Sequence, residues 1–166
     1  MSIFPTKILL ATDGSENANL ASSTAADLAK GTNSELHVLY VGGMPSVFYE
    51  SPGAIVLDPD LQGRMEEAAK EAARTKLKEQ VQKISEAGAE ITEIHARVGY
   101  PDAEIVELAE ELGAGLIVVG SRGLGPLRRA LMGSVSDSVV RHAHCPVMVV
   151  RPQKERTAQH EAGSAT

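Results

Sequence analysis

The chain of 166 residues contains no tryptophan, one cysteine and only five aromatic residues. The single cysteine, Cys145, cannot form a disulfide within the chain, and its place before an apolar run favours a packed side chain over a nucleophile. With so few aromatics, an interior must be built from alanine, valine, leucine and isoleucine. Apolar residues make up 43% of the chain, which is too many for a disordered protein, and the length suits one domain.

Two further sequence patterns are missing, a long apolar run and the pattern of a signal peptide in the first residues. No stretch approaches the ~20 consecutive apolar residues of a membrane helix, so we expect no membrane insertion. The first residues run within a few positions into a strand pattern without the architecture of a signal peptide, so we expect a cytoplasmic protein. Residues 153–166 show no apolar periodicity, which predicts a single domain over residues 1–152 followed by a disordered tail.

Positive charge is scarce overall but gathers in one segment. The net charge of −6 argues against general nucleic-acid binding. Residues 1–114 have a balance of −10, whereas residues 115–151 carry five arginines and one aspartate, a balance of +4. A basic segment in an acidic protein indicates either an anion site or an ordinary solvated surface, and charge alone does not separate the two.

Five short apolar segments alternate with helical patterns along the chain. One of them, residues 94–98, alternates apolar with polar residues, which indicates a strand with one face partly exposed to solvent. The other four are almost continuously apolar, as is typical of parallel strands covered on both faces: residues 8–11, 36–41, 116–119 and 147–150. This order predicts a doubly wound α/β fold with a five-stranded parallel sheet and helices on both faces.

The helical patterns cover residues 16–30, 61–87, 101–112 and a last segment from about Gly133. Asp13 and Glu16 are spaced like a capping box for the first helix. The connection over residues 42–60 carries three prolines with Phe48 and Tyr49, and such a long loop is either functional or a disordered surface excursion. In the second helix, apolar residues recur on the face expected to point inward: Leu61, Met65, Ala68, Ala72, Leu77, Val81 and Ile84.

Glycines follow the fourth strand pattern in a spacing that suits phosphate. Gly120 and Gly123 come at the end of that strand, and Gly133-Ser134 opens the last helix. Glycines let backbone N–H groups approach a ligand, and a helix start adds unpaired donors and the positive end of the helix dipole. The basic segment falls on the same residues, which favours an anion site over a solvated surface.

Two familiar phosphate motifs are excluded, and a metal site near the C-terminal strand is disfavoured. A Walker A loop needs a lysine after its last glycine, and none lies between Gly120 and Val150. A Rossmann fingerprint would place its third glycine at position 128, which is an arginine. His142, His144 and Cys145 lack the second pair of ligands that a tetrahedral metal site needs, so no metal site is predicted there.

The spacing Gly-x2-Gly-x9-Gly-Ser, from Gly120 to Ser134, resembles the ATP-binding motif of the universal stress protein family. Residues 8–15 (ILLATDGS) are similar to the first strand and turn of that family, and residues 144–150 (HCPVMVV) to its last strand. The resemblance covers residues 5–151. It implies an adenine nucleotide alpha hydrolase-like fold with strand order 3-2-1-4-5 and ATP over the ends of strands one and four.

The resemblance also implies a set of nucleotide-binding residues. Asp13 would contact the nucleoside and is the nearest carboxylate for the Mg²⁺ that accompanies a triphosphate. Some nucleotide-binding members have proline at the position of Ala11, which should act through shape alone. These residues do not indicate whether the ligand is ATP, AMP or cyclic AMP. The full set is Ala11, Thr12, Asp13, Val41, Gly120, Ser121, Arg122, Gly123, Gly133, Ser134, Val135 and Ser136.

Three functions stay open at this point. The first is a regulatory module in which ATP occupancy changes what a dimer presents to a protein partner. The second is a slow ATPase or self-phosphorylating protein with Ser134 or Ser136 as the acceptor, although no pattern positions a base. The third is an interaction protein that has kept only the fold, which the intact glycine motif disfavours.

The last strand, residues 147–150, would form an apolar edge of the sheet. A bare apolar edge invites aggregation, so it must be covered by a second copy of the chain or by a helix of the same chain. Members of the resembled family commonly pair through this edge, and we expect a homodimer. The alternating strand at residues 94–98 tolerates the free edge better.

Overall fold

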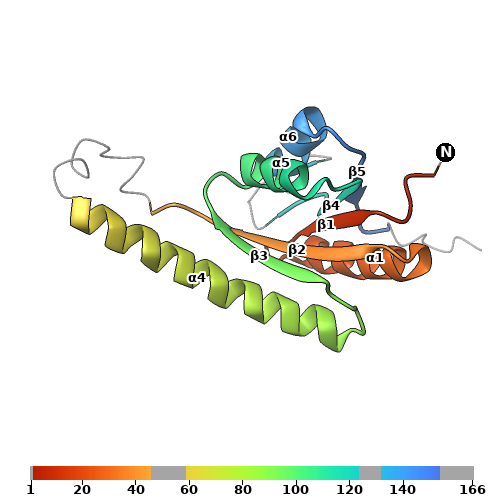
Figure 1. Cartoon of the computed structure of the whole chain (residues 1–166), viewed down its shortest axis with the longest axis horizontal. Helices are drawn as coiled ribbons and strands as arrows, with labels where there is room; N and C mark the ends of the chain where they lie inside the picture. The colour runs from red at the N-terminus through yellow and green to blue at the C-terminus, as the bar shows by residue number, and fades with distance from the viewer. Residues whose placement is uncertain (1, 46–58, 124–131, 154–166) are drawn as a thin grey trace, which may run out of the picture.

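A computed structural model describes residues 2–45, 59–123 and 132–153. Strands and helices alternate through these residues (Figure 1). Much of the predicted loop at 42–60, with Phe48 and Tyr49, lies outside the described residues, and so do Arg128, Arg129 and the predicted tail beyond residue 153. The elements are β1 (Lys7–Ala11), α1 (Glu16–Thr32), β2 (Glu35–Gly42), α4 (Pro59–Glu86), β3 (Glu93–Val98), α5 (Pro101–Leu112), β4 (Leu116–Gly120), α6 (Ser134–His142) and β5 (Val147–Val150).

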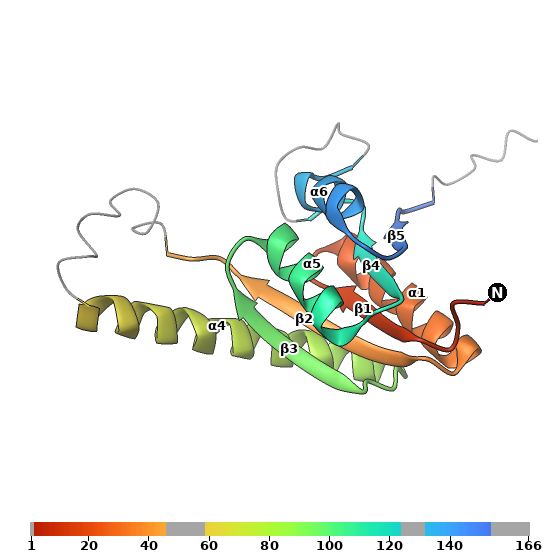
Figure 2. The same ribbon diagram turned by 45° about the horizontal axis from the view of Figure 1, so that its top comes forward.

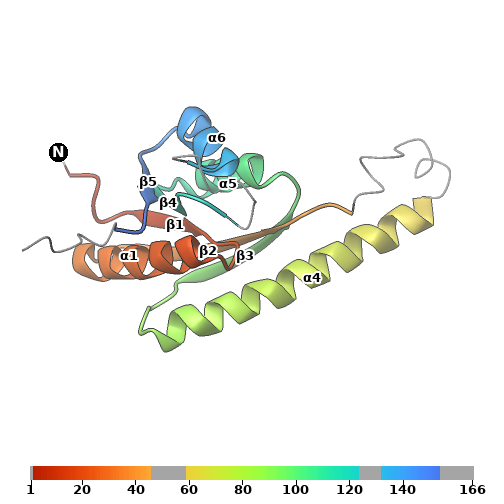
Figure 3. The ribbon, with the colours of Figure 1, turned by 180° about the vertical axis from the view of Figure 1, so that it is seen from behind.

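The five strands form one parallel sheet in the order β3-β2-β1-β4-β5. Helices α1 and α4 cover one face and α5 and α6 the other, as the front and rear views show (Figures 1 and 3). The predicted doubly wound α/β fold is therefore confirmed, as is the strand order that the family resemblance implies.

The continuous apolar strands are explained by burial on both faces. Ile8 and Leu10 of β1 pack toward α1 and α4, whereas Leu9 between them packs toward α5 and α6, and all three are fully buried. Ala21 and Ala25 present small side chains from α1 to the sheet, which lets this helix approach the strands closely. Among the described helices, none combines the length and apolar character needed to cross a bilayer.

The start of α1 corrects the predicted cap. The helix begins at the predicted residue, but its N-cap is Ser15, whose Oγ accepts a hydrogen bond of 3.2 Å from the Ala18 N–H. Asp13 lies two residues earlier, where its Oδ1 accepts from the Ser15 N–H at 2.9 Å. Gly14 has a φ of +81° and turns the chain between the two residues, so the aspartate cannot be the residue next to the helix.

Replacing Ser15 by alanine should lower the free energy of unfolding by about 1 kcal/mol, because the Ala18 N–H loses its acceptor. Urea unfolding followed by circular dichroism measures this loss. Ser23→Ala is the matched control, since Ser23 is an exposed mid-helix serine whose hydroxyl donates to the Asn19 carbonyl. An equal loss in both variants would contradict the capping role.

Helix α4 starts two residues earlier than predicted, and only its second half packs as predicted. Leu77 and Ile84 are buried against the sheet, but Leu61, Ala68 and Ala72 from the predicted inward face are exposed. The first half of the helix runs past the strands, so the apolar stripe there finds no sheet beneath it (Figures 1 and 3). Two residues not predicted to be inward, Ala73 and Gln80, are buried instead.

Candidate functional site

A cavity of about 310 Å³ lies where β1 and β4 end. These two strands are neighbours in the sheet, but the chain leaves β1 toward β2 on one side and β4 toward β5 on the other. Such a reversal opens a crevice at the carboxyl ends of the strands, which is where ligands bind in open α/β sheets. Helices α5 and α6 lie over this side of the sheet (Figure 2). The described residues thus place the cavity at the switch point of the fold.

Eleven of the twelve residues predicted from sequence line this cavity. The exception is Ser121, which is buried and whose carbonyl accepts the Gly133 N–H at 2.6 Å and the Ser136 hydroxyl at 3.1 Å. Ser121 therefore ties the end of β4 to the start of α6. The lining residues are Ala11, Thr12, Asp13, Val41, Gly120, Arg122, Gly123, Gly133, Ser134, Val135 and Ser136.

The sequence prediction missed the apolar wall of the cavity. Leu39 lies two residues before Val41, and the alternation of a strand points both side chains to the face of α5 and α6. That period-two spacing was the available signal for Leu39. Pro101 and Ile105 come from the start of α5, whose approach to the cavity follows only from the packing. The missed lining residues are Ala18, Leu39, Pro101, Ile105 and Val119.

The N-terminus of α6 opens into the cavity without a side-chain cap in the described structure. Its N-cap is Gly133, whose own N–H is bound by Ser121. Helix geometry leaves the N–H groups of the next residues, Ser134 to Ser136, without acceptors inside the helix. Those donors and the positive end of the helix dipole make this end of the cavity suitable for an anion.

The last two glycines of the motif, Gly123 and Gly133, meet different surroundings. A Cβ on Gly123 would collide with Oδ2 of Asp13, which is the end of a side chain, so the carboxylate would have to turn away to admit it. A Cβ on Gly133 would make ordinary contacts, 3.5 Å from the Arg122 Cα and the Ser121 O, at an unstrained φ of −72°. A methyl group at 123 would thus displace the Asp13 carboxylate, whereas at 133 the described structure leaves room for one.

The two serines predicted as phosphate acceptors differ in their freedom. Ser136 is 3% exposed, and its hydroxyl faces the carbonyls of Ser121 and Gly133 at 3.1 and 3.0 Å. This hydroxyl fixes the loop against the helix. Ser134, the first residue of α6, is exposed and lines the cavity. Any role in accepting a phosphoryl group therefore suits Ser134 better than Ser136.

The predicted basic segment contributes to the cavity mainly through one described residue. Arg122 lines it from the turn after β4. Arg141 lies near the other end of α6 and pairs with Asp137 at 2.9 Å on the solvent side. Arg151 follows β5 and is exposed. Among the described residues of this segment, Arg122 therefore brings positive charge to the cavity, beside the helix dipole.

The histidines and the cysteine near the C-terminal strand do not converge. The His142 Nδ1 lies 2.8 Å from the Ser138 carbonyl, and the His144 Nε2 pairs with Glu110 at 2.9 Å. Cys145 packs partly buried against the core on the α5 and α6 side, and burial raises the pKa of its thiol. A raised pKa keeps the thiol protonated and weakly nucleophilic.

Comparison with known proteins adds to this geometry. The sequence profile of the universal stress protein family matches residues 5–151. The chain is 38% identical over 147 residues to universal stress protein YxiE of Bacillus subtilis, a match that covers 87% of this chain and 98% of the relative.

Solved structures agree in fold. The chain is similar to universal stress protein UspA from Lactobacillus plantarum, with a TM-score of 0.67, 30% identity and coverage of 89% and 99% of the two chains. A universal stress protein in complex with cAMP has a TM-score of 0.60 and 28% identity, with coverage of 89% and 97%. One from Archaeoglobus fulgidus in complex with dAMP has a TM-score of 0.55 and 25% identity, with coverage of 90% and 99%.

Proposed function

The chain belongs to the universal stress protein family, and we propose that it binds an adenine nucleotide, ATP, in the cavity between β1 and β4. The two similar structures that hold cAMP and dAMP support an adenine nucleotide as the ligand. The observation that carries the proposal is the start of α6, which points uncapped N–H groups into a cavity whose opposite wall is apolar. One end of this cavity suits phosphate and the other suits a flat apolar ring.

The placement of the ligand follows from that polarity. The adenine lies against Leu39, Val41 and Ile105, where the wall carries no charge. The ribose lies near Gly120 and Asp13 at the ends of β4 and β1. The phosphates lie between Gly123 and the first turn of α6, where backbone N–H groups and Arg122 balance their charge.

The surroundings of Asp13 fit a divalent cation that accompanies the phosphates. One carboxylate oxygen, Oδ1, is held by the Ser15 N–H, and the other, Oδ2, faces the space that a side chain at 123 would fill. Carboxylate oxygens are preferred ligands of Mg²⁺, which usually keeps several waters and binds through one or two carboxylates plus phosphates. Asp13 would hold Mg²⁺ there, and the ion would neutralise phosphate charge.

We propose a regulatory role for this binding rather than fast chemistry. The described lining contains no histidine or lysine, and Asp13 is its single carboxylate. Occupancy of the cavity changes what the protein presents to a regulatory protein partner around Arg122 and Gly123. The protein acts as a homodimer joined through the edge strand β5, whose four residues are apolar and only half-buried in the single chain.

Titration of the nucleotide-free protein with ATP and Mg²⁺ in a calorimeter tests the proposal. We expect saturable binding of one ATP per chain, and at least about a tenfold loss of affinity in Gly133→Ala. The added methyl lies 3.8 Å from the Gly123 N, inside the gap proposed for the phosphates, while the fold accommodates it. Gly43→Ala is the control, because a methyl at this exposed glycine meets nothing within 4 Å and lies outside the cavity lining.

The outcomes separate the functions that the sequence left open. Absence of binding at millimolar ATP would reject the nucleotide proposal and favour an interaction protein. Release of ADP over time, lost in Gly133→Ala, would instead support a slow ATPase, and a phosphoryl group on Ser134 a self-phosphorylating protein. Competition by AMP and cyclic AMP ranks the three adenine nucleotides.

A further inference from the structure

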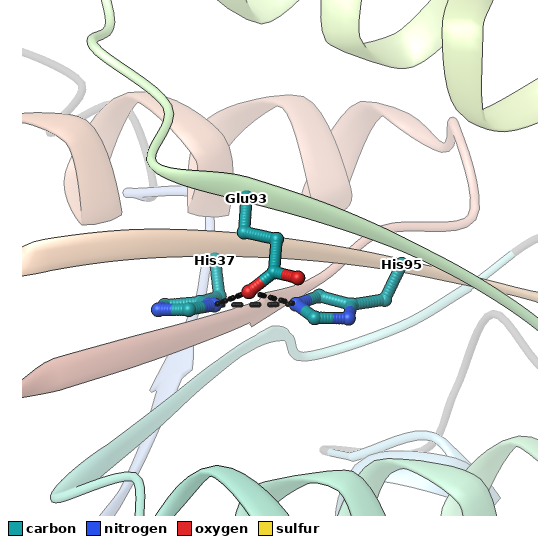
Figure 4. A group of neighbouring side chains, drawn as sticks. All are labelled: His37, Glu93 and His95. Carbon is teal, nitrogen blue, oxygen red and sulfur yellow. Dashed lines mark hydrogen bonds and ion pairs between the residues drawn. The ribbon is translucent and has the colours of Figure 1, made fainter.

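Three side chains converge on the α5 side of the sheet, away from the glycine motif (Figure 4). The Glu93 carboxylate points between the rings of His37 and His95. The His37 Nδ1 lies 3.2 Å from the His95 Nε2 and 3.6 Å from Glu93 Oε2, and the His95 Nε2 lies 3.8 Å from the same oxygen. Two ring nitrogens and one carboxylate oxygen therefore surround a common point.

The register between β2 and the edge strand β3 brings the three side chains together. His37 of β2 stands directly opposite Glu93 of β3, and His95 follows two residues later opposite Leu39. Residues two apart in a strand point to the same face, so all three side chains leave the sheet on one side. None of the three residues lines the cavity, although Leu39, which stands opposite His95, does, so the cluster and the cavity are adjacent but separate sites.

The spacing matches the coordination shell of a small transition-metal ion. Zn²⁺ binds imidazole nitrogen and carboxylate oxygen at about 2.0–2.1 Å, so two tetrahedral ligands stand ~3.3–3.4 Å apart. The distances between the three ligand atoms, 3.2, 3.6 and 3.8 Å, are close to this ligand–ligand separation. An ion could reach all three atoms with small side-chain adjustments.

The hydrogen bond of the His37 Nε2 leaves the other ring nitrogen, Nδ1, to coordinate a metal. Its Nε2 lies 3.2 Å from Glu35 Oε2, and the tautomer with the proton on Nε2 donates to this carboxylate and turns the Nδ1 lone pair toward the cluster. A carboxylate that binds the far nitrogen of a ligating histidine is the usual outer-shell partner of metal sites.

The charges around the cluster favour a cation. Glu35 and Glu93 contribute negative charge from the two strands, and Glu111 from α5 lies near His95. The neighbouring cation Arg97 is engaged by Glu104 at 3.4 Å and by Glu111. Around the histidines, the described carboxylates outnumber the one guanidinium.

The burial of the cluster leaves one side open. The side chain of His37 is 3% exposed and that of His95 15%, while that of Glu93 is 60% exposed. A cation can enter from the solvent beside Glu93 and keep a water there as a fourth ligand. Two histidines, a glutamate and a water are a donor set that Zn²⁺ adopts in proteins.

We propose that His37, Glu93 and His95 form a binding site for a divalent transition-metal ion of the zinc class, with one coordination position left to solvent. The site joins the edge strand β3 to β2 through metal bonds. It is independent of the nucleotide cavity, so it can be tested without nucleotide.

The test uses the full chain after treatment with a chelator. We expect calorimetry to show one Zn²⁺ per chain, and Co²⁺ in its place to give the intense visible absorption of tetrahedral coordination. His95→Ala and Glu93→Gln should each weaken Zn²⁺ binding more than a hundredfold, because a direct ligand contributes more than an outer-shell partner. Glu35→Gln should weaken it by about 10–100-fold as such a partner.

His144→Ala and Cys145→Ser are the matched controls, since both remove a metal-binding side chain outside the cluster. They should leave the Zn²⁺ affinity unchanged. Zn²⁺ should also raise the unfolding temperature of the unsubstituted protein but not that of His95→Ala. His95 and Glu93 are chosen over the buried His37 because their replacement disturbs the core less.

Equal Zn²⁺ affinity in His95→Ala and in the unsubstituted protein would overturn the proposal, and so would a loss of binding confined to His144→Ala or Cys145→Ser. A weak octahedral Co²⁺ spectrum would overturn the assigned coordination. None of these results would bear on the ATP titration.

Discussion

Replacing Gly120 by alanine is expected to lower the free energy of unfolding by about 3 kcal/mol. The glycine ends β4 directly beneath the first turn of α1. An added Cβ would lie 2.8 Å from the Asn17 carbonyl carbon, 2.9 Å from its oxygen and 3.0 Å from the Ala18 N. These are backbone atoms of a helix, so they cannot rotate away as the end of a side chain can. The helix must move from the sheet, and the turn that holds Asp13 must move with it.

Urea unfolding measures this loss, and Gly31→Ala is the matched control. Gly31 lies in the same helix, and a methyl there meets nothing within 4 Å. Alanine inside a helix is more stable than glycine by up to about 1 kcal/mol, so the control should gain stability. Gly120→Ala should therefore lower the free energy of unfolding, and Gly31→Ala should raise it. Equal effects at 120 and 31 would show that α1 does not press on Gly120.

Placing a charge at Val149 is expected to convert the proposed dimer into a monomer. The Ile117 N–H donates to Pro146 and the Ser121 N–H to Val150, so alternate residues of β5 face β4. The backbone groups of Val147 and Val149 between them face away from β4, along an edge that no described strand covers. An aspartate at position 149 would have to lose its hydration shell in the interface, which costs free energy, and it would repel the same aspartate of the second copy.

Sedimentation equilibrium measures the mass, and circular dichroism confirms that the variant is folded. Ile94→Asp is the control, because Ile94 is a 43% exposed apolar residue of β3, the strand at the opposite edge. We expect a dimer for the unsubstituted protein and for Ile94→Asp, and a monomer for Val149→Asp. An unchanged mass for Val149→Asp would reject the β5 interface, and a monomer in Ile94→Asp alone would move it to β3.

The local patterns of this chain predict most of its fold because each reports a local physical preference. Continuous apolar runs report burial on two faces, and Pro101 and Gly113 mark the two ends of α5 where a missing N–H and a φ of +63° are tolerated. The glycine spacing locates the cavity because glycine lets the backbone approach a carboxylate or a helix closely. Gly123 against Asp13 and Gly120 against α1 are two such approaches.

The features that the sequence patterns did not predict depend on registers and lengths that no local preference fixes. His37 and His95 lie 58 positions apart, and only the pairing of β2 with β3 brings their rings to 5.5 Å. The apolar stripe of α4 has the period of a buried helix along its whole length, but the sheet ends before the helix does. Ser121 belongs to the glycine segment by position, yet its carbonyl is turned inward to hold α6.

The projecting half of α4 gives the molecule a gradient of local stability. The helix has 28 residues, and all of its buried side chains lie between Ala73 and Ile84. A helical segment of about 12–15 residues without tertiary contacts is only marginally stable in water, so the first half depends on the packed half for its nucleus. Fraying from Pro59 therefore costs far less free energy than global unfolding, and amide hydrogens there exchange through small openings. The protein can lose or re-form several turns of helix while its sheet and the cavity between β1 and β4 stay intact.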